Sequence, residues 1–244
     1  MIKIYIILAS SLLLFFSCSI TNEKKEFYES GTLKALYFVD DSGLKEGKAQ
    51  MFYSDGSLKF EGKFKNNLIH GKAIIYDERG EIKEIANYHK GKLNGIVEKY
   101  YSGRKLKVRM YYSNDKIDGV AYSYYESGVL NIKEHYLKGI LDGLSTHYYE
   151  DGRIYAEVNY KRGLKNGAYR LYNKNGTILE KGNYLENKLH GKIELFNENG
   201  NLVTKGFFSK GIRDGIWETT NKEGKKKIIK YEKGEIKKSD IMSL

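Results

Sequence analysis

Apolar and aromatic segments alternate with polar, glycine-containing segments along most of the chain. Between residues 143 and 166, two segments of six to eight residues rich in Tyr, Val, Ile and Thr are separated by Glu150-Asp151-Gly152. In the second segment, apolar side chains occupy every other position from Ile154 to Tyr160. Because side chains alternate between the two faces of a strand, and Asp-Gly supplies the positive φ of a tight turn, this pattern predicts a β-hairpin.

The hairpin pattern recurs with a fixed period. Glycine returns at a constant interval, at positions 47, 71, 95, 119, 143, 167, 191 and 215. We number positions within a repeat from this glycine, so that the next residue is position +1. Aromatic residues stand at +5 and +17, and we expect them to be structural. Their tyrosines are Tyr76, Tyr100, Tyr124, Tyr148 and Tyr172 at +5, and Tyr88, Tyr112, Tyr136, Tyr160 and Tyr184 at +17.

A second glycine marks the turn inside each repeat. Leucine or isoleucine stands at +11, and glycine usually precedes it by two residues. The exception is the third full copy, in which Arg104 takes the glycine position and Gly103 comes one residue early. We expect a local bulge or an altered turn there.

Each repeat therefore reads as strand, turn, strand, turn. So short a period leaves no room for a crossover helix, and repeats built from helix pairs are usually longer. The pattern predicts an all-β fold, an elongated single-layer antiparallel β-meander of tandem 24-residue hairpin repeats. The array spans residues 27–234, with about eight full copies and a degenerate N-terminal one. At about 4.8 Å per strand, it should be a twisted ribbon roughly 75 to 80 Å long.

The repeat positions also predict two different faces of the sheet. We expect positions +5, +11, +15 and +17 to share one face lined by Tyr and Phe, which curling of the sheet, a partner or a second copy would cover. Position +6 should point to the other face and be exposed. Its tyrosines are the candidate partner-binding residues, Tyr53, Tyr101, Tyr125 and Tyr149.

The first residues resemble a bacterial lipoprotein signal peptide. Lys3 is followed by an apolar run to Phe16, and small Ser17 precedes Cys18, the only cysteine. We expect a signal peptide at residues 1–17, acylation of Cys18, and a polar tether at residues 18–26. The protein would then be exported and anchored to a bacterial membrane, at its periplasmic face or the cell surface. An ordinary secretory signal with a free thiol, or an uncleaved anchor, remains an alternative.

The formal net charge of +11 leaves nucleic acid, membrane surfaces and acidic proteins open as partners. Seven lysines against two glutamates lie in residues 225–238, and residues 235–244 form a basic C-terminal tail. The candidate basic patch is Lys225, Lys226, Lys227 and Lys230. It is either a solvated edge strand, since lysine discourages further strand pairing, or an electrostatic contact with anionic lipid or an acidic partner.

Recognisable catalytic and metal-binding motifs are absent from the sequence. There is no G-x-S-x-G, no H-E-x-x-H and no phosphate-binding glycine loop. The five histidines fall at four different repeat positions, of which His70 and His190 share one. We therefore expect no catalytic residue, metal or cofactor. Nucleic-acid binding is not favoured, because acidic residues are interleaved with the lysines.

The repeats resemble MORN repeats. The resemblance lies in His70-Gly71-Lys72, in His190-Gly191-Lys192 and in the Tyr-x-x-Gly spacing of residues 88–91 and 136–139. It is closest to the 24-residue variant found in bacterial envelope proteins and in proteins assigned as antitoxin components. The resemblance implies a lipid-anchored, non-catalytic binding or scaffold protein of the envelope, with a protein or glycan partner. Alternatives are an antitoxin or immunity protein that binds a toxin, a phospholipid-binding module and, lastly, an enzyme.

Overall fold

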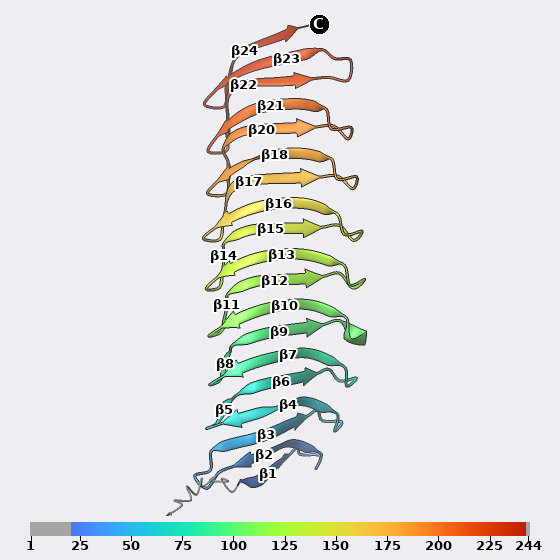
Figure 1. Ribbon diagram of the computed structural model, residues 1–244, viewed down its shortest axis with the longest axis vertical. Helices are drawn as coiled ribbons and strands as arrows, with labels where there is room; N and C mark the ends of the chain where they lie inside the picture. The colour runs from blue at the N-terminus through green and yellow to red at the C-terminus, as the bar shows by residue number, and fades with distance from the viewer. Residues whose placement is uncertain (1–20, 243–244) are drawn as a thin grey trace, which may run out of the picture.

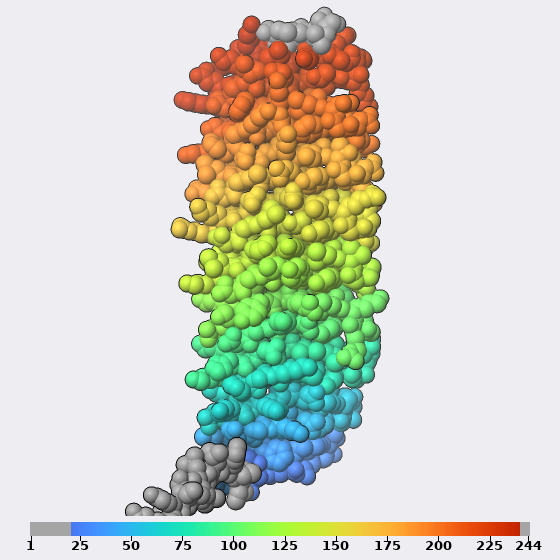
Figure 2. Space-filling model, in the orientation of Figure 1, coloured from blue at the N-terminus to red at the C-terminus, as the bar shows by residue number. Residues whose placement is uncertain are grey.

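The computed structural model describes residues 21–242, with side chains to residue 239. These residues form a single 24-stranded antiparallel sheet in which strands follow one another in chain order (Figure 1). Figure 2 shows the same order as successive colour bands along an elongated body, so each repeat contacts only its neighbours. The predicted all-β, single-layer meander of tandem hairpins is confirmed.

Five repeats contain a first strand, a second strand of eight residues and a two-residue strand that leads into the next repeat. The first strands are β3 Lys45–Phe52, β6 Gly71–Tyr76, β9 Gly95–Tyr100, β12 Gly119–Tyr124, β15 Gly143–Tyr148, β17 Leu164–Tyr172, β20 Gly191–Phe196 and β22 Ile212–Thr220. The second strands are β4 Leu58–Lys65, β7 Ile82–His89, β10 Leu106–Ser113, β13 Leu130–Leu137, β16 Ile154–Lys161, β18 Ile178–Leu185 and β21 Leu202–Ser209. The two-residue strands are β5 Leu68–Ile69, β8 Lys92–Leu93, β11 Lys116–Ile117, β14 Ile140–Leu141 and β19 Lys188–Leu189.

Both turns of the repeat depend on residues that accept a positive φ. In the first turn, Gly56 has φ 88° and donates its N–H to the carbonyl of Tyr53 at 3.0 Å. In the second, Asn66 and Asn67 have φ 51° and 65°, the geometry of a two-residue hairpin loop. These local preferences explain why the chain reverses direction at the same points in each repeat.

The irregular third copy has an altered turn. Ser102–Arg104 forms a short 3-10 helix, and Arg104 adopts φ 58° where other repeats use glycine. Tyr101 N–H still donates to the carbonyl of Lys105 at 2.8 Å, so the strands on either side keep their pairing.

A β-bulge decides which side chains share a face. In the first full repeat, Met51 pairs with Phe60 but Phe52 pairs with Leu58, so one residue of β4 is left out of the ladder. Gly47 pairs with Phe64, so Phe52, five positions further along β3, lies on the face opposite +17, and the bulge moves +11 to that face as well. The Tyr76 hydroxyl accordingly donates to Glu61, which neighbours Gly62 and therefore points to the opposite side. The prediction that these four positions share a face is wrong.

We call the two sides face 1, with positions +2, +4, +13, +15 and +17, and face 2, with positions +1, +3, +5, +14 and +16. Face 1 carries the buried residues at its centre, where large and small side chains complement one another. Ala73 pairs with Ala86, whereas Tyr169 pairs with Gly182. The Trp217 indole covers Gly206 and is 6% exposed. A single layer thus buries its central row without a second sheet.

The ends of the sheet extend beyond the predicted array. β1 Asn22–Phe27 pairs with β2 Leu33–Val39, so residues 22–26 form a strand where we expected a tether. β23 Lys226–Glu232 pairs with β24 Glu235–Met242, so most of the expected C-terminal tail is also a strand. Charged side chains on β1 and β24 discourage further strand pairing at the two ends of the sheet. The predicted signal peptide and Cys18 lie outside the described residues.

Candidate functional site

The tyrosines at position +6 link successive repeats. Each is half-buried, and its hydroxyl donates a hydrogen bond to a main-chain carbonyl oxygen at the start of the next turn. The bonds are Tyr53 to Tyr76 at 2.8 Å, Tyr101 to Tyr124 at 3.0 Å, Tyr125 to Tyr148 at 2.7 Å and Tyr149 to Tyr172 at 2.9 Å. The expectation that these four side chains are exposed is wrong, because each is half-buried and its hydroxyl is used within the sheet. Their role in binding a partner stays a prediction.

Asparagine or aspartate takes the same position in other repeats and closes the turn instead. Asn173 Oδ1 accepts the N–H groups of Asn175 at 2.9 Å and Thr177 at 3.0 Å. Asn197 and Asn221 make the same pair of bonds. Position +6 therefore serves either the link between repeats or its own turn, and both roles are structural.

The structural tyrosines divide between the two faces. Those at +17 lie on face 1 and those at +5 lie on face 2, and all ten are half-buried. Several donate to carboxylates. Burial and the Glu98 carboxylate raise the pKa of Tyr100 to about 12, and burial and Glu134 do the same for Tyr136. Burial and Glu157 raise the pKa of Tyr172 to about 12. These phenols stay neutral and act as hydrogen-bond donors.

The predicted basic patch does not gather on one surface. Lys226 and Lys227 are consecutive residues of β23, so their side chains point to opposite faces. Lys225 lies in the preceding turn, 4.0 Å from Glu223. Lys230 pairs across the ladder with Lys238. The four exposed lysines are spread around the C-terminal end of the sheet.

Most charged groups in the central and C-terminal part of face 2 neutralise one another. The cross-strand pairs on this face are Arg109–Glu98 at 2.7 Å, Arg170–Glu157 at 3.6 Å, Lys181–Glu194 at 2.7 Å and Lys205–Glu218 at 2.9 Å. Hydrogen bonds from Lys181 and Lys192 lower the pKa of the Glu194 carboxyl. Because the two members of each pair neutralise one another, this part of face 2 has little unpaired charge for an ionic partner.

Uncovered apolar side chains cross the middle of face 2. Ile96 and Tyr111 are direct cross-strand partners on β9 and β10, and they are 47% and 48% exposed. Val120 and Leu144 occupy the same +1 position in the next two repeats and are half-buried. We call these four residues the apolar row. Sequence reasoning missed the apolar row. The signal for it was at position +1, where lysine in the first two full repeats, Lys48 and Lys72, is replaced by isoleucine, valine and leucine in the next three.

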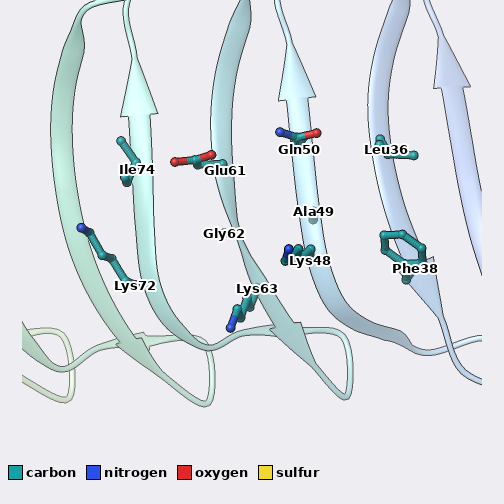
Figure 3. Close-up of a pocket in the computed structure, with 10 residues that line it drawn as sticks. All are labelled: Leu36, Phe38, Lys48, Ala49, Gln50, Glu61, Gly62, Lys63, Lys72 and Ile74. Atoms are coloured by element: carbon teal, nitrogen blue, oxygen red, sulfur yellow. The ribbon is translucent and has the colours of Figure 1, made fainter. Parts of the chain in front are cut away.

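A groove opens on face 2 near the N-terminal end. It has a volume of about 470 Å³ and crosses β2, β3, β4 and β6 (Figure 3). Leu36, Phe38 and Ile74 supply its apolar surface. Lys48, Lys63 and Lys72 supply its charge, and sequence reasoning singled out none of the three for this role.

A polar cluster interrupts face 1 near β15. Ser145 Oγ lies 3.0 Å from His147 Nε2 and 3.4 Å from Glu134 Oε1, and the Tyr155 hydroxyl lies 3.4 Å from His147 Nδ1. Burial lowers the pKa of His147. Ser145, however, is 0% exposed, so its hydroxyl cannot meet a substrate. The cluster satisfies buried polar groups and forms no open active site.

The described residues offer neither a metal site nor a membrane-spanning helix. Within residues 21–242, no group of three or more His, Cys, Asp or Glu side chains is arranged to hold a metal ion. Over the same part of the chain, no helix has the length and apolar character needed to cross a membrane.

Comparison with protein families matches the repeats seen in the structure. The MORN repeat variant family matches residues 45–66, 69–90, 117–138, 141–162, 165–186 and 189–210. The copy with the altered turn falls in the gap between the second and third of these matches. A search of curated proteins gave no match.

The chain is also similar to solved structures, at low sequence identity. One is the Tc holotoxin pore of Photorhabdus luminescens, with 12% identity over 86% of this chain and a TM-score of 0.20. Another is the TcdB2–TccC3–Cdc42 complex, also with 12% identity over 86% of the chain and a TM-score of 0.20. The chain spans 14% and 13% of those chains, respectively. At these scores, the likeness contributes nothing to the functional assignment.

Proposed function

The chain belongs to the MORN repeat variant family, and we propose that it is a non-catalytic scaffold that binds a protein partner through the apolar row of face 2. The family's repeats are consistent with a binding or scaffold role. The partner and the cellular location are part of our proposal.

The observation that carries the proposal is the exposure of Ile96 and Tyr111. Aromatic and aliphatic side chains that lie side by side in the middle of a rigid sheet lose little conformational entropy on binding. Contiguous exposed apolar surface is typical of contact sites. The ion pairs on neighbouring positions of the same face would form the polar rim that surrounds such a contact.

The proposal places this scaffold in the bacterial envelope, held to a membrane through acylated Cys18. Support comes from the lipoprotein-like sequence at residues 1–18. β1 begins at Asn22, so an anchor at Cys18 would hold the N-terminal end of the sheet close to the membrane and leave the remaining repeats to extend from it.

Affinity capture with the full chain tests the binding surface. A double variant, Ile96→Thr and Tyr111→Thr, removes apolar area while keeping residues that suit a strand. The matched control is Leu68→Thr with Ile212→Thr, since those side chains are 46% and 51% exposed but lie at the second turn. We expect the first variant to lose partners that the wild type and the control retain. An unchanged partner list for all three proteins would refute the proposed surface.

A further inference from the structure

Three lysines come together in the N-terminal groove of face 2. Lys48 and Lys63 are direct cross-strand partners on β3 and β4. Lys72 occupies position +1 on β6, the next long strand, and Figure 3 shows the three side chains on these neighbouring strands. Like charges placed opposite one another destabilise a sheet. The groove therefore contains an arrangement that is unfavourable for the fold alone.

Carboxylates neutralise this cluster only in part. Within the described residues, none of the three ammonium groups is in an ion pair or a side-chain hydrogen bond, whereas further along face 2 cations are paired across the strands. Glu61 lines the same groove and stays negatively charged while it accepts a tyrosine hydroxyl at 2.9 Å. Glu98 is paired with Arg109 at 2.7 Å and is close enough to attract Lys72 as well. With three lysines against one glutamate in its lining, the groove keeps a net positive charge that suits an anion.

The groove also offers a surface for the body of a ligand. Phe38 and Leu36 are half-buried on β2, beside the lysines, and Gln50 adds an amide that can donate and accept hydrogen bonds. The aliphatic part of each lysine side chain and the ring of Phe38 can pack against C–H groups that lie between the charges of a ligand. This combination favours an anion with a carbon skeleton over a bare inorganic ion.

The spacing of the charges distinguishes among linear polyanions. The lysines follow one another at the strand spacing, about 4.8 Å, in a direction across the strands. An acidic polysaccharide places a pyranose ring, with its C–H groups, between successive anionic groups, and lysine stems and the Phe38 ring can contact such a ring. An extended acidic peptide places same-side residues two positions apart, about 6.6 Å, and matches the row less well.

We propose that Lys48, Lys63 and Lys72, with Phe38, form a binding site for an acidic polysaccharide. This inference rests on the proposed binding function but uses a different part of face 2 from the apolar row. It adds a second ligand of another chemical class to the same scaffold.

Binding assays with oligosaccharides test the site. The full chain, purified in detergent, would be titrated with heparin and polygalacturonate fragments, with neutral dextran and poly-glutamate as comparisons. We expect binding to both acidic glycans. The triple variant Lys48→Gln, Lys63→Gln and Lys72→Gln should weaken it roughly tenfold, because three exposed charge contacts are lost. The control Lys225→Gln, Lys226→Gln and Lys227→Gln removes equal charge at the other end and should change the Kd little.

The outcomes separate this inference from general attraction and from the proposed function. Equal weakening by both triple variants, equal affinity for poly-glutamate, or no binding of acidic glycans would overturn it. The melting temperature of the groove variant should not fall, because its substitutions relieve like-charge repulsion. Partner capture through Ile96 and Tyr111 should persist in this variant, so failure of the glycan site would leave the proposed function standing.

Discussion

The hydroxyl of Tyr125 donates a 2.7 Å hydrogen bond to the main-chain carbonyl of Tyr148, 23 residues further along the chain. The same relationship joins Tyr101 to Tyr124 and Tyr149 to Tyr172. These bonds connect one repeat to the next outside the β-ladder. The tyrosines at position +6 therefore stabilise the contact between successive repeats.

Loss of one such bond should measurably weaken the sheet. Tyr125→Phe removes the hydroxyl and leaves the ring, so we expect the free energy of unfolding to fall by about 1 kcal/mol. Urea denaturation would measure it. The control Tyr111→Phe affects a 48% exposed side chain with no hydrogen bond in the structure and should be neutral. Equal stability of the two variants would contradict the linking role.

Gly206 should tolerate no larger residue while Trp217 is present. A Cβ at this position would overlap the indole ring, so Gly206→Ala should destabilise the protein by about 1–3 kcal/mol. A double-mutant cycle checks the cause. In a Trp217→Ala background, the added methyl should cost much less, and an unchanged penalty would mean that the backbone, not the indole, sets the requirement.

Alkaline pH should destabilise the sheet through its buried phenols. The folded-state pKa of Tyr136 is raised to about 12 by burial and by the Glu134 carboxylate, above the ordinary value of 10.0. Because the folded state favours the neutral phenol, Tyr136 stabilises the folded protein fully below pH 10, and this stabilisation is lost as the pH rises toward 12. Thermal unfolding across this range measures the loss. Tyr136→Phe should show a smaller decline than the wild type, and an identical decline would contradict this assignment.

Removal of Cys18 tests the lipid anchor. If Cys18 is acylated, Cys18→Ala should move the protein from the membrane fraction to the soluble fraction, because the acyl chains supply the membrane affinity. Fractionation of cells that express each form gives the readout. A variant that still sediments with membranes would rule out acylation as the main anchor. Cys18→Ser is a second variant, which leaves a polar side chain of similar size.

The fold follows from the amino-acid sequence, because each repeat contains the residues that form its own turns. Gly56 and its counterparts accept the positive φ of the first turn, and Asn66-Asn67 or a residue followed by glycine forms the second. With both reversals set locally at a constant period, the strands between them have only their neighbours to pair with. An elongated antiparallel meander follows from these residues alone.

Which side chains meet depends on strand pairing in the folded sheet. The bulge beside Phe52 left one residue of β4 unpaired and placed Leu58, the partner of Phe52, on the face opposite Phe64. Strand register set Lys48 directly against Lys63, although a complete turn separates the two in the chain. A one-residue change in register reverses the face of every later side chain, and periodicity does not specify where such a change occurs. The fold could thus be read from the sequence, but its surfaces required the structure.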